Sequence, residues 1–519
     1  MGNSPGEDVR SPPMAKIIII GAGVGGLSAA ARLAKSGHSV EIFESSHRTG
    51  GKCQTEWIGD YAFDTGPSLF TLPAVYKDLF LKTGKRFEHV LTATAVNPSF
   101  RYNFPDGKRV DFVNLDLPKT CAAIDEALGR EAGDAWHRIM QRAEVMWDIS
   151  RNPFIQSAAP TLRSLLKERD FLRNLRFMAP WSSLRNITRG YSQDPHILAI
   201  VDRYATYTGS DPRKAPAALL TIPFIESSFG AWHIEGGVGR LSEELTQRVL
   251  GLGVTIHLNS PVQEIIVEGN KAVGIIDAAG ERHVADKVIA NADPSLVYNR
   301  LIPRKVKAAK SERRKLAQSD PSLAGFVLLL GLDNSKIAQA APELKHHNIY
   351  FTNNYDAEFD AIFKQKVPVG DPTIYICKPD DPTMTKRANT EAWFVLINAP
   401  RHDPRNGWDW STSGEKYAKH IIAKLDALGL RVSERIDVME FRTPLDLENA
   451  TGAPGGSIYG SATHGARSAF TKAKNISPIE NLYCVGGGAH PGGGLPLVGI
   501  SAELVVDAIN GTKPGESFH

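Results

Sequence analysis

At 519 residues, the chain is long enough to form two or more subdomains, each with its own core. Its composition, 42% hydrophobic and 23% charged, is ordinary for a folded globular protein, and a net charge of +3 is too small to indicate nucleic-acid binding. The sequence contains no run of about 18 apolar residues, so no helix that spans a bilayer is predicted. The four cysteines are scattered along the sequence: Cys53, Cys121, Cys377 and Cys484. Their spacing predicts neither a disulfide framework nor a cysteine metal site, and a reducing compartment is expected.

Residues 1–13 are polar and rich in Pro and Gly, without the apolar core of a signal peptide. Gly6 departs from the myristoylation pattern, which requires Ser or Thr at that position. We expect a disordered tail, with Met14 as an alternative start.

The first motif follows immediately. Lys16–Ile20 is a β-branched run expected of a strand buried on both faces, and it leads into the glycine-rich segment 21–26. Residues 27–36 predict a helix and residues 39–43 a second strand, which ends at Glu44. This order of strand, glycines, helix, strand and acid is typical of a dinucleotide-binding unit.

The glycine spacing has a physical reason. Gly21 permits the tight turn, Gly23 leaves room for a pyrophosphate, and Gly26 lets the helix approach the strand. The free N–H groups of the helix N-terminus then face the phosphates. Glu44, 23 residues after Gly21, can accept hydrogen bonds from ribose hydroxyl groups.

The residues after Glu44 favour FAD over NAD. Two cations, Arg48 and Lys52, flank Gly50 and Gly51, and a Phe-Asp-Thr-Gly-Pro segment ends at Pro67. This pattern resembles the glycine-rich extension of the amine oxidase and carotenoid desaturase superfamily of flavoproteins. The resemblance implies that Arg48 and the paired glycines run along the FAD pyrophosphate and ribityl chain. A charged surface turn is the alternative for Arg48 and Lys52.

A second strand–glycine–helix unit lies near the end of the chain. A strand is predicted over 481–485, a glycine- and proline-rich turn over 486–496, and a helix over 497–509. The helix N-terminus is expected to face the flavin ring and to favour negative charge on the reduced flavin. A purely structural glycine loop is the alternative.

Short strands between these units are predicted over 253–259, 261–268, 272–277 and 284–290. In the superfamily that the chain resembles, the residue at Val262 contacts the adenine through its backbone. The FAD domain is therefore expected to be assembled from three separated segments. The predicted FAD-binding residues are Gly21, Ala22, Gly23, Gly26, Glu44, Arg48, Gly50, Gly51, Lys52, Pro67, Val262, Gly486, Gly487, Gly494, Leu495 and Pro496.

Several segments refine the resemblance. The tail 481–502, GGVGRL at 236–241 and VIANAD at 288–293 are similar to bacterial phytoene desaturase-type carotenoid enzymes, and HHNIYF at 346–351 resembles the branch that includes hydroxycarotenoid 3,4-desaturases. The resemblance implies FAD-dependent desaturation, with hydride transfer from a long hydrophobic polyene to flavin N5 and with quinone or oxygen as electron acceptor. The cofactor would carry the difficult step, while the protein holds the substrate and excludes water.

The expected fold class is α/β: a Rossmann-like FAD-binding domain of the amine oxidase type, a β-sheet substrate domain and a helical, membrane-facing subdomain. The FAD-binding domain is assigned to 14–95, 232–300 and 476–512 and the substrate domain to 96–118 and 301–475. The helical subdomain is assigned to 119–231.

No catalytic acid or base is assigned; His233, Glu235 and His490 are candidates only, and His490 is as easily explained as a turn residue. The pair His346-His347 has no third ligand at metal spacing, so no metal is assigned.

Residues 161–190 carry seven Lys or Arg against two acids, with leucines on about one half of a predicted helix. A basic amphipathic helix is typical of a protein resting on an anionic membrane. An ordinary helix facing the core is the alternative, but a substrate dissolved in lipid favours the membrane. The protein is thus expected at the periphery of a membrane in the cytoplasm.

Three other functions stay open. A flavin amine oxidase would share the N-terminal motifs and could attach its flavin to Cys484. A Rab escort or dissociation-inhibitor protein would bind prenyl chains on a related fold without flavin, although the complete glycine motif disfavours this reading. Within the favoured family, oxygenase or isomerase activity is not distinguished from desaturation.

Overall fold

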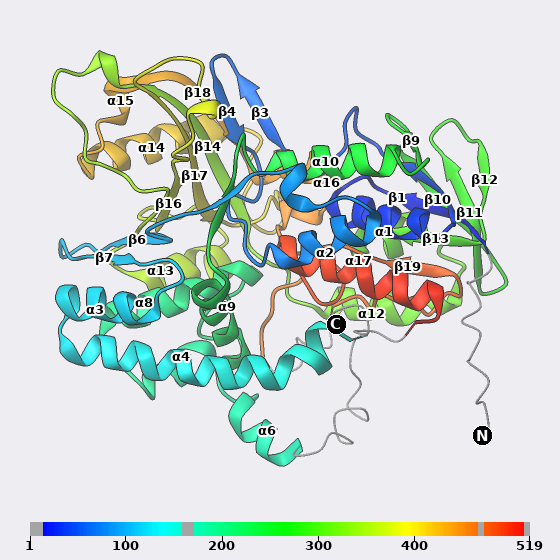
Figure 1. Ribbon diagram of the computed structural model, residues 1–519, viewed down its shortest axis with the longest axis horizontal. Helices are drawn as coiled ribbons and strands as arrows, with labels where there is room; N and C mark the ends of the chain where they lie inside the picture. Colours follow the sequence, from blue (N-terminus) through cyan, green and yellow to red (C-terminus); the bar gives the residue numbers. More distant parts are fainter. Residues whose placement is uncertain (1–13, 158–170, 466–471, 513–519) are drawn as a thin grey trace, which may run out of the picture.

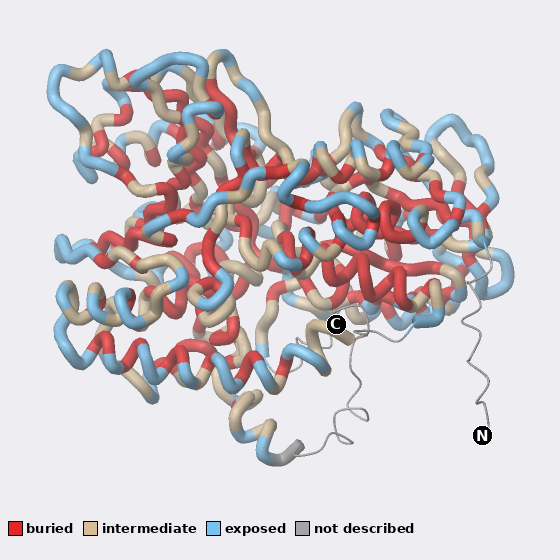
Figure 2. Tube along the Cα trace, viewed as in Figure 1, coloured by how far each residue is buried: buried red, intermediate tan, exposed pale blue. Residues whose placement is uncertain are grey.

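The structure is a computed structural model, and it describes residues 14–157, 171–465 and 472–512. Two sheets organise it (Figure 1): a parallel sheet with its helices forms one lobe, and a larger mixed sheet with two sets of helices forms the other. Figure 2 shows that the buried residues follow these two sheets and the helices packed on them.

The parallel sheet has five strands in the order β19-β13-β1-β2-β9. Every neighbouring pair in it is parallel. The strands are β1 (Lys16–Ile20), β2 (Ser39–Phe43), β9 (Thr255–His257), β13 (Lys287–Ala290) and β19 (Leu482–Cys484). All five lie inside strands that the sequence predicts, although they come from widely separated parts of the chain.

Alternate isoleucines of β1 enter two different cores. Ile17 and Ile19 pack under α1 (Val24–Lys35), α10 (Gly239–Leu250) and α17 (Leu495–Asn510). Ile18 and Ile20 pack against a three-stranded antiparallel sheet, which consists of β10 (Val262–Glu268), β11 (Lys271–Asp277) and β12 (Arg282–Val284). This division explains why β1 is apolar at every position.

Helix α1 begins at Val24, three residues before the predicted start at Leu27. Gly25 and Gly26 are helical although glycine disfavours helix interiors, because close packing there leaves no room for a side chain. The last helix, α17, likewise begins at Leu495 and not at residue 497.

The second sheet has seven strands in the order β18-β14-β17-β16-β15-β6-β7. The strands are β6 (Phe100–Asn103), β7 (Arg109–Phe112), β14 (Ala324–Asp333), β15 (His347–Tyr350), β16 (Ile374–Cys377), β17 (Thr390–Ala399) and β18 (Ile436–Arg442). Helix α14 (Gly414–Ala427) covers one part of it, and α15 (Val432–Arg435) follows. The strand pair β3 (Thr55–Ile58) and β4 (Tyr61–Asp64) joins the lobes, because Tyr61 and Phe63 pack on β14 and β17.

Helices cover the β6–β7 end of this sheet. Their shared core contains Trp136 of α4 (Arg130–Ser150) and Ile200 of α8 (Pro195–Arg203). The neighbouring helices are α3 (Leu117–Leu128), α6 (Phe171–Met178), α7 (Leu184–Arg189) and α9 (Thr221–Phe229). Two further helices are α2 (Ala74–Thr83) and α13 (Tyr355–Asp360), and β5 (Ala93–Ala95) pairs with β8 (Trp232–Ile234).

The basic segment 161–190 is not one helix. Its helix α6 ends at Met178, Ala179 adopts a positive φ of 43°, and α7 begins at Leu184. Leu162, Leu165 and Leu166, which the sequence placed on the apolar side, lie outside the described residues.

Candidate active site

The first glycine turn leaves the carboxyl end of β1. Gly21 has a φ of +96°, and its amide donates to the carbonyl of Phe43 at 2.8 Å. Gly23 caps α1 without any side-chain hydrogen bond, so amides of the first helical turn stay available to an anion. A Cβ atom on Gly26 would lie only 2.2 Å from the carbonyl oxygen of Gly21. The turn therefore has the backbone that a phosphate-binding loop requires.

Asn291, which follows β13, joins the two glycine-rich segments. Its Nδ2 donates to the carbonyl of Gly21 at 3.2 Å, and a Cβ atom on Gly486 would lie 2.5 Å from its Oδ1. A Cβ atom on Gly25 would lie 3.2 Å from the Cα of Gly486, so the two segments are in contact, as the sequence predicts. Asn291 itself was missed, although it lies in VIANAD and directly follows a predicted strand.

Glu44 is buried at the end of β2 and holds this turn in place. Its carboxylate accepts from the amide of Ala22 at 2.7 Å and from the amide of Ser46 at 2.8 Å. The amide of Ser260 donates to the Glu44 carbonyl at 2.8 Å, which brings the start of β10, with Val262, close to Glu44. The two residues predicted to contact the adenosine part of FAD are thus neighbours.

The paired glycines lie against the same turn. The Gly50 amide donates to the carbonyl of Ala22 at 2.9 Å, and a Cβ atom on Gly51 would lie 3.1 Å from the Cα of Gly23. Arg48 is engaged differently from the prediction, since its guanidinium forms an ion pair with Glu56.

The second glycine turn is fixed from several sides. The Tyr76 hydroxyl donates to the Leu495 carbonyl at 2.6 Å, and the Asn475 side-chain amide donates to the His490 carbonyl at 2.8 Å. Gly494 caps α17 without a side-chain hydrogen bond, and Pro496 lies in the first helical turn. A Cβ atom on Gly487 would be 3.5 Å from the Cα of Gly493, so this turn folds closely on itself.

Two lysines flank this second turn. Lys52 Nζ donates to the carbonyl of Ile458 at 3.0 Å, and Lys472 Nζ lies 3.4 Å from the carbonyl oxygen of Tyr459. Surrounding protein lowers the pKa of the Lys472 ammonium group to about 8, while the nearby Asp293 carboxylate opposes the shift. Lys472 was not predicted, because nothing local in the sequence indicates its proximity to the glycine turn.

The three candidate acid–base residues differ in their surroundings. His233 is buried, and its Nε2 lies 2.7 Å from Asp381 Oδ2. Burial opposes ionisation of Asp381, but hydrogen bonds from Thr383, His233 and Gly236 hold its pKa at about 2. The side chain of Glu235 is exposed.

His490 is also buried, and its Nε2 contacts the carbonyl of Ser157 at 3.1 Å. Burial lowers its pKa, so it is neutral at physiological pH. Among the described residues, the polar contact of its side chain is thus with backbone, which fits the alternative interpretation as a turn residue.

His346 and His347 acquire a neighbour that sequence spacing did not suggest. Cys377 of β16 faces His347 of β15 directly across the sheet. The sequence offers this pair no third ligand at metal spacing, but β-sheet pairing brings Cys377 beside it from thirty residues away.

Comparison with known proteins agrees with this geometry. The family of flavin containing amine oxidoreductases matches residues 24–334. The chain belongs to this family. A 1-hydroxycarotenoid 3,4-desaturase of Flavobacterium sp. strain P99-3 is 32% identical over 96% of the chain and 100% of its own length. A 4,4'-diapolycopene oxygenase of Methylomonas sp. is 31% identical over 95% of the chain and 98% of its own length. Among solved structures, a putrescine oxidase variant superimposes with a TM-score of 0.63 at 15% identity, covering 96% of the chain and 98% of its own.

The residues present fit the flavin cofactor of this family. Two uncapped helix N-termini and glycines without space for a Cβ atom meet around Asn291, as an extended dinucleotide requires. Covalent attachment at Cys484 does not fit, because this thiol is buried in β19 and burial raises its pKa to about 12.

Proposed function

We propose that this flavin enzyme desaturates a carotenoid or a carotenoid precursor. The observation that carries the proposal is similarity at about 30% identity over nearly the whole chain to enzymes named for this chemistry. The meeting of the two glycine segments at Asn291 supplies the matching cofactor site. A hydroxylated carotenoid is the substrate class that the name of the Flavobacterium relative suggests.

The cofactor site is proposed to divide along its length. Glu44 and Val262 hold the adenosine end, and the turn from Gly21 to Gly26, with Gly50 and Gly51, holds the pyrophosphate. The second turn, from Gly486 to Pro496, holds the flavin end. Lys52 and Lys472 add positive charge there, which favours negative charge on the ring.

When bound, FAD accepts a hydride equivalent from one substrate carbon, and the adjacent carbon loses a proton as the double bond forms. The protein aligns the long polyene beside the cofactor and excludes water. The described residues offer two proton acceptors near the junction of the lobes: Lys472, whose lowered pKa leaves part of it neutral, and His233, which Asp381 orients. The electrons then pass to quinone or oxygen.

The domain assignments remain part of the proposal: 14–95, 232–300 and 476–512 bind FAD, and 96–118 with 301–475 forms the substrate domain. Residues 119–231 form a helical subdomain through which the protein associates with a membrane. No helix among the described residues has the length and apolarity needed to cross a bilayer. We therefore propose peripheral attachment on the cytoplasmic side, where the four free thiols would stay reduced.

Incubation of the FAD-loaded protein with a panel of acyclic and hydroxylated carotenes in liposomes tests the function. Desaturation predicts a red-shifted product that is two hydrogens lighter for each added double bond. An oxygenated product would instead support the activity of the Methylomonas relative. An unchanged mass with altered retention would indicate isomerisation, and no conversion of any carotene would contradict the proposal.

A further inference from the structure

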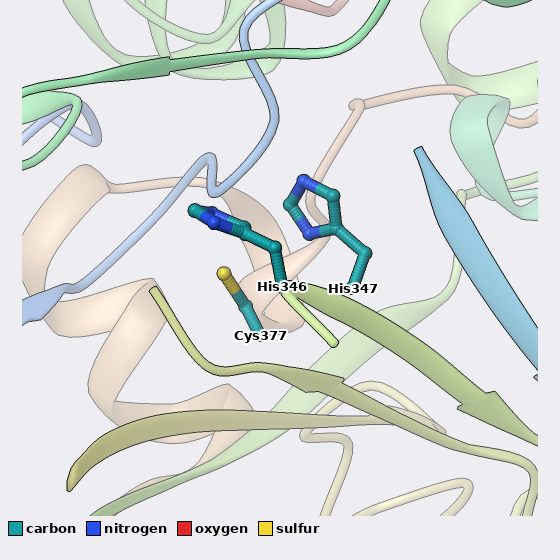
Figure 3. A group of neighbouring side chains, drawn as sticks. All are labelled: His346, His347 and Cys377. Atoms are coloured by element: carbon teal, nitrogen blue, oxygen red, sulfur yellow. The ribbon is translucent and has the colours of Figure 1, made fainter. Parts of the chain in front are cut away.

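Two histidines and a cysteine converge at one end of the β15–β16 strand pair. In Figure 3 the side chains of His346, His347 and Cys377 point to the same side of the strands. One potential ligand atom from each residue lies within 4.8 Å of the other two. All three are buried, with exposed fractions of 8%, 0% and 2%. Buried polar atoms normally pair with one another or with backbone.

His347 has the arrangement of a metal ligand. Its Nδ1 lies 2.8 Å from the Tyr375 hydroxyl, which in turn lies 2.8 Å from the Ser68 hydroxyl. Its Nε2 is buried and has no hydrogen-bond partner. A metal-bound histidine typically fixes its ring with one nitrogen and coordinates with the other.

The surroundings hold the cluster in place. The His347 ring stacks on Phe100 at 5.0 Å, and the His346 ring packs on His347 at 4.6 Å and on His233 at 4.9 Å. The amide of Asp380 lies 3.5 Å from His346 Nδ1, at the limit of a hydrogen bond. Rigid neighbours of this kind keep potential ligands close together before any ion binds.

A small cavity adjoins the cysteine. Its volume is about 10 Å³, room for about one water molecule, and its lining includes Cys377, Asp64 and Met384. Neither histidine lines this cavity, so it lies beside the thiol and not between the three side chains.

We propose that His346, His347 and Cys377 bind a transition-metal ion of the zinc class. Two imidazole nitrogens and one thiolate suit borderline and soft cations such as Zn²⁺, whereas Mg²⁺ and Ca²⁺ prefer oxygen ligands. Binding converts the Cys377 thiol to a metal-bound thiolate and releases its proton to solvent. Three protein ligands leave the fourth tetrahedral position of zinc to a water molecule or another small ligand. The site goes beyond flavin chemistry, and its presence does not depend on the proposed substrate.

Metal analysis of the purified, FAD-loaded protein tests the site directly. We expect one Zn²⁺ per chain, or uptake of one after treatment with a chelator and addition of Zn²⁺. Co²⁺ in place of Zn²⁺ should produce two signals. One is a thiolate-to-cobalt charge-transfer band, and the other is absorption in the red, where oxidised flavin does not absorb. Neither signal involves catalytic turnover, so a failure here would leave the desaturase proposal intact.

Variants then identify the ligands. Cys377→Ser should remove the charge-transfer band and weaken metal binding at least about 10-fold. His347→Gln should weaken metal binding by a similar factor. Any Co²⁺ that still binds should show the charge-transfer band, because Cys377 is unchanged. Cys121→Ser changes a half-buried thiol of α3 outside the cluster and should change neither signal. Circular dichroism and flavin content would show that each variant is folded.

Two results would overturn the proposal. One is absence of bound Zn²⁺ and Co²⁺ in the folded wild-type protein. The other is uptake that stays unchanged in both Cys377→Ser and His347→Gln, since the ion would then bind elsewhere.

Discussion

Gly26 illustrates how much of the cofactor site depends on single atoms. Its missing Cβ would lie 2.2 Å from the Gly21 carbonyl oxygen, and that oxygen belongs to backbone that cannot move aside easily. We predict that Gly26→Ala destabilises the protein by about 1–3 kcal/mol and abolishes retention of FAD, because the helix must shift away from the turn.

Flavin absorbance after purification and thermal unfolding measure the two effects of Gly26→Ala. Gly370→Ala is the matched control, because no atom lies within 4 Å of the added Cβ and its φ is not positive. Wild-type FAD content in Gly26→Ala would show that the cofactor does not bind at this turn.

The sequence predicts those site residues whose role depends on the backbone conformation of their own segment. Gly21 and Gly26 are recognisable because a turn and a close helix approach need glycine. Asn291 and Lys472 are not, because each acquires its neighbours only when strands or loops from distant parts of the chain meet. Glu44 lies between these cases: its position after β2 was predicted, but its bond to the Ala22 amide was not.

Helix α13 is tied to the seven-stranded sheet by one buried carboxyl group. Glu358 accepts hydrogen bonds from Asn398 of β17 at 2.9 Å and from the amide of Thr373 at 2.8 Å. Burial nevertheless raises its pKa to about 7. The unfolded chain releases this proton near pH 4.5, whereas the folded chain keeps it until about pH 7. The contribution of Glu358 to stability is therefore full below the unfolded pKa and is lost as the pH rises through 7.

We predict that the free energy of unfolding falls by about 3 kcal/mol from this group between pH 4 and pH 8. Glu358→Gln, which cannot ionise, should remove that part of the pH dependence. Denaturant unfolding of both proteins across this range measures it. Equal pH profiles would mean that Glu358 is already ionised at pH 5 in the folded protein.

For strands, as for residues, local sequence predicts some features, whereas others depend on contacts between distant parts of the chain. The strands of the parallel sheet were predicted from short apolar runs, of which the β-branched run of β1, followed by Gly21, is the clearest. The order of the seven-stranded sheet was not, since β15 pairs with β6 through Asn348 and Arg101, more than 240 residues apart. The Cys377–His347 pairing depends on this same sheet, which explains why sequence spacing missed the cluster.

At the scale of the molecule, α6 is the element that projects furthest from the helical side of the protein (Figure 1). Arg173 and Arg176 on it are exposed, and Trp181 after it has an exposed fraction of 71%. Cations beside an exposed tryptophan are typical of a surface that lies at the interface of an anionic bilayer. A substrate dissolved in lipid gives the enzyme a reason to bind there.

We predict that the protein sediments with anionic liposomes at low salt and is released at high salt. Because each cation near such a surface contributes about 1 kcal/mol, Arg173→Glu combined with Arg176→Glu should weaken binding more than about 10-fold. Trp181→Ala should weaken it at any salt concentration. Trp57→Ala is the control, since Trp57 has an exposed fraction of 50% but lies on β3, on the opposite side of the molecule from α6 (Figure 1).

The pattern of losses separates the two contributions. If charge attracts the protein and the indole anchors it, the arginine variant should lose its salt dependence, while Trp181→Ala keeps it at lower affinity. Sedimentation equal to wild type in both variants would place the membrane contact elsewhere on the molecule. A wild-type protein that stays in the supernatant at low salt would mean that the carotenoid reaches the active site without stable attachment of the enzyme to the bilayer.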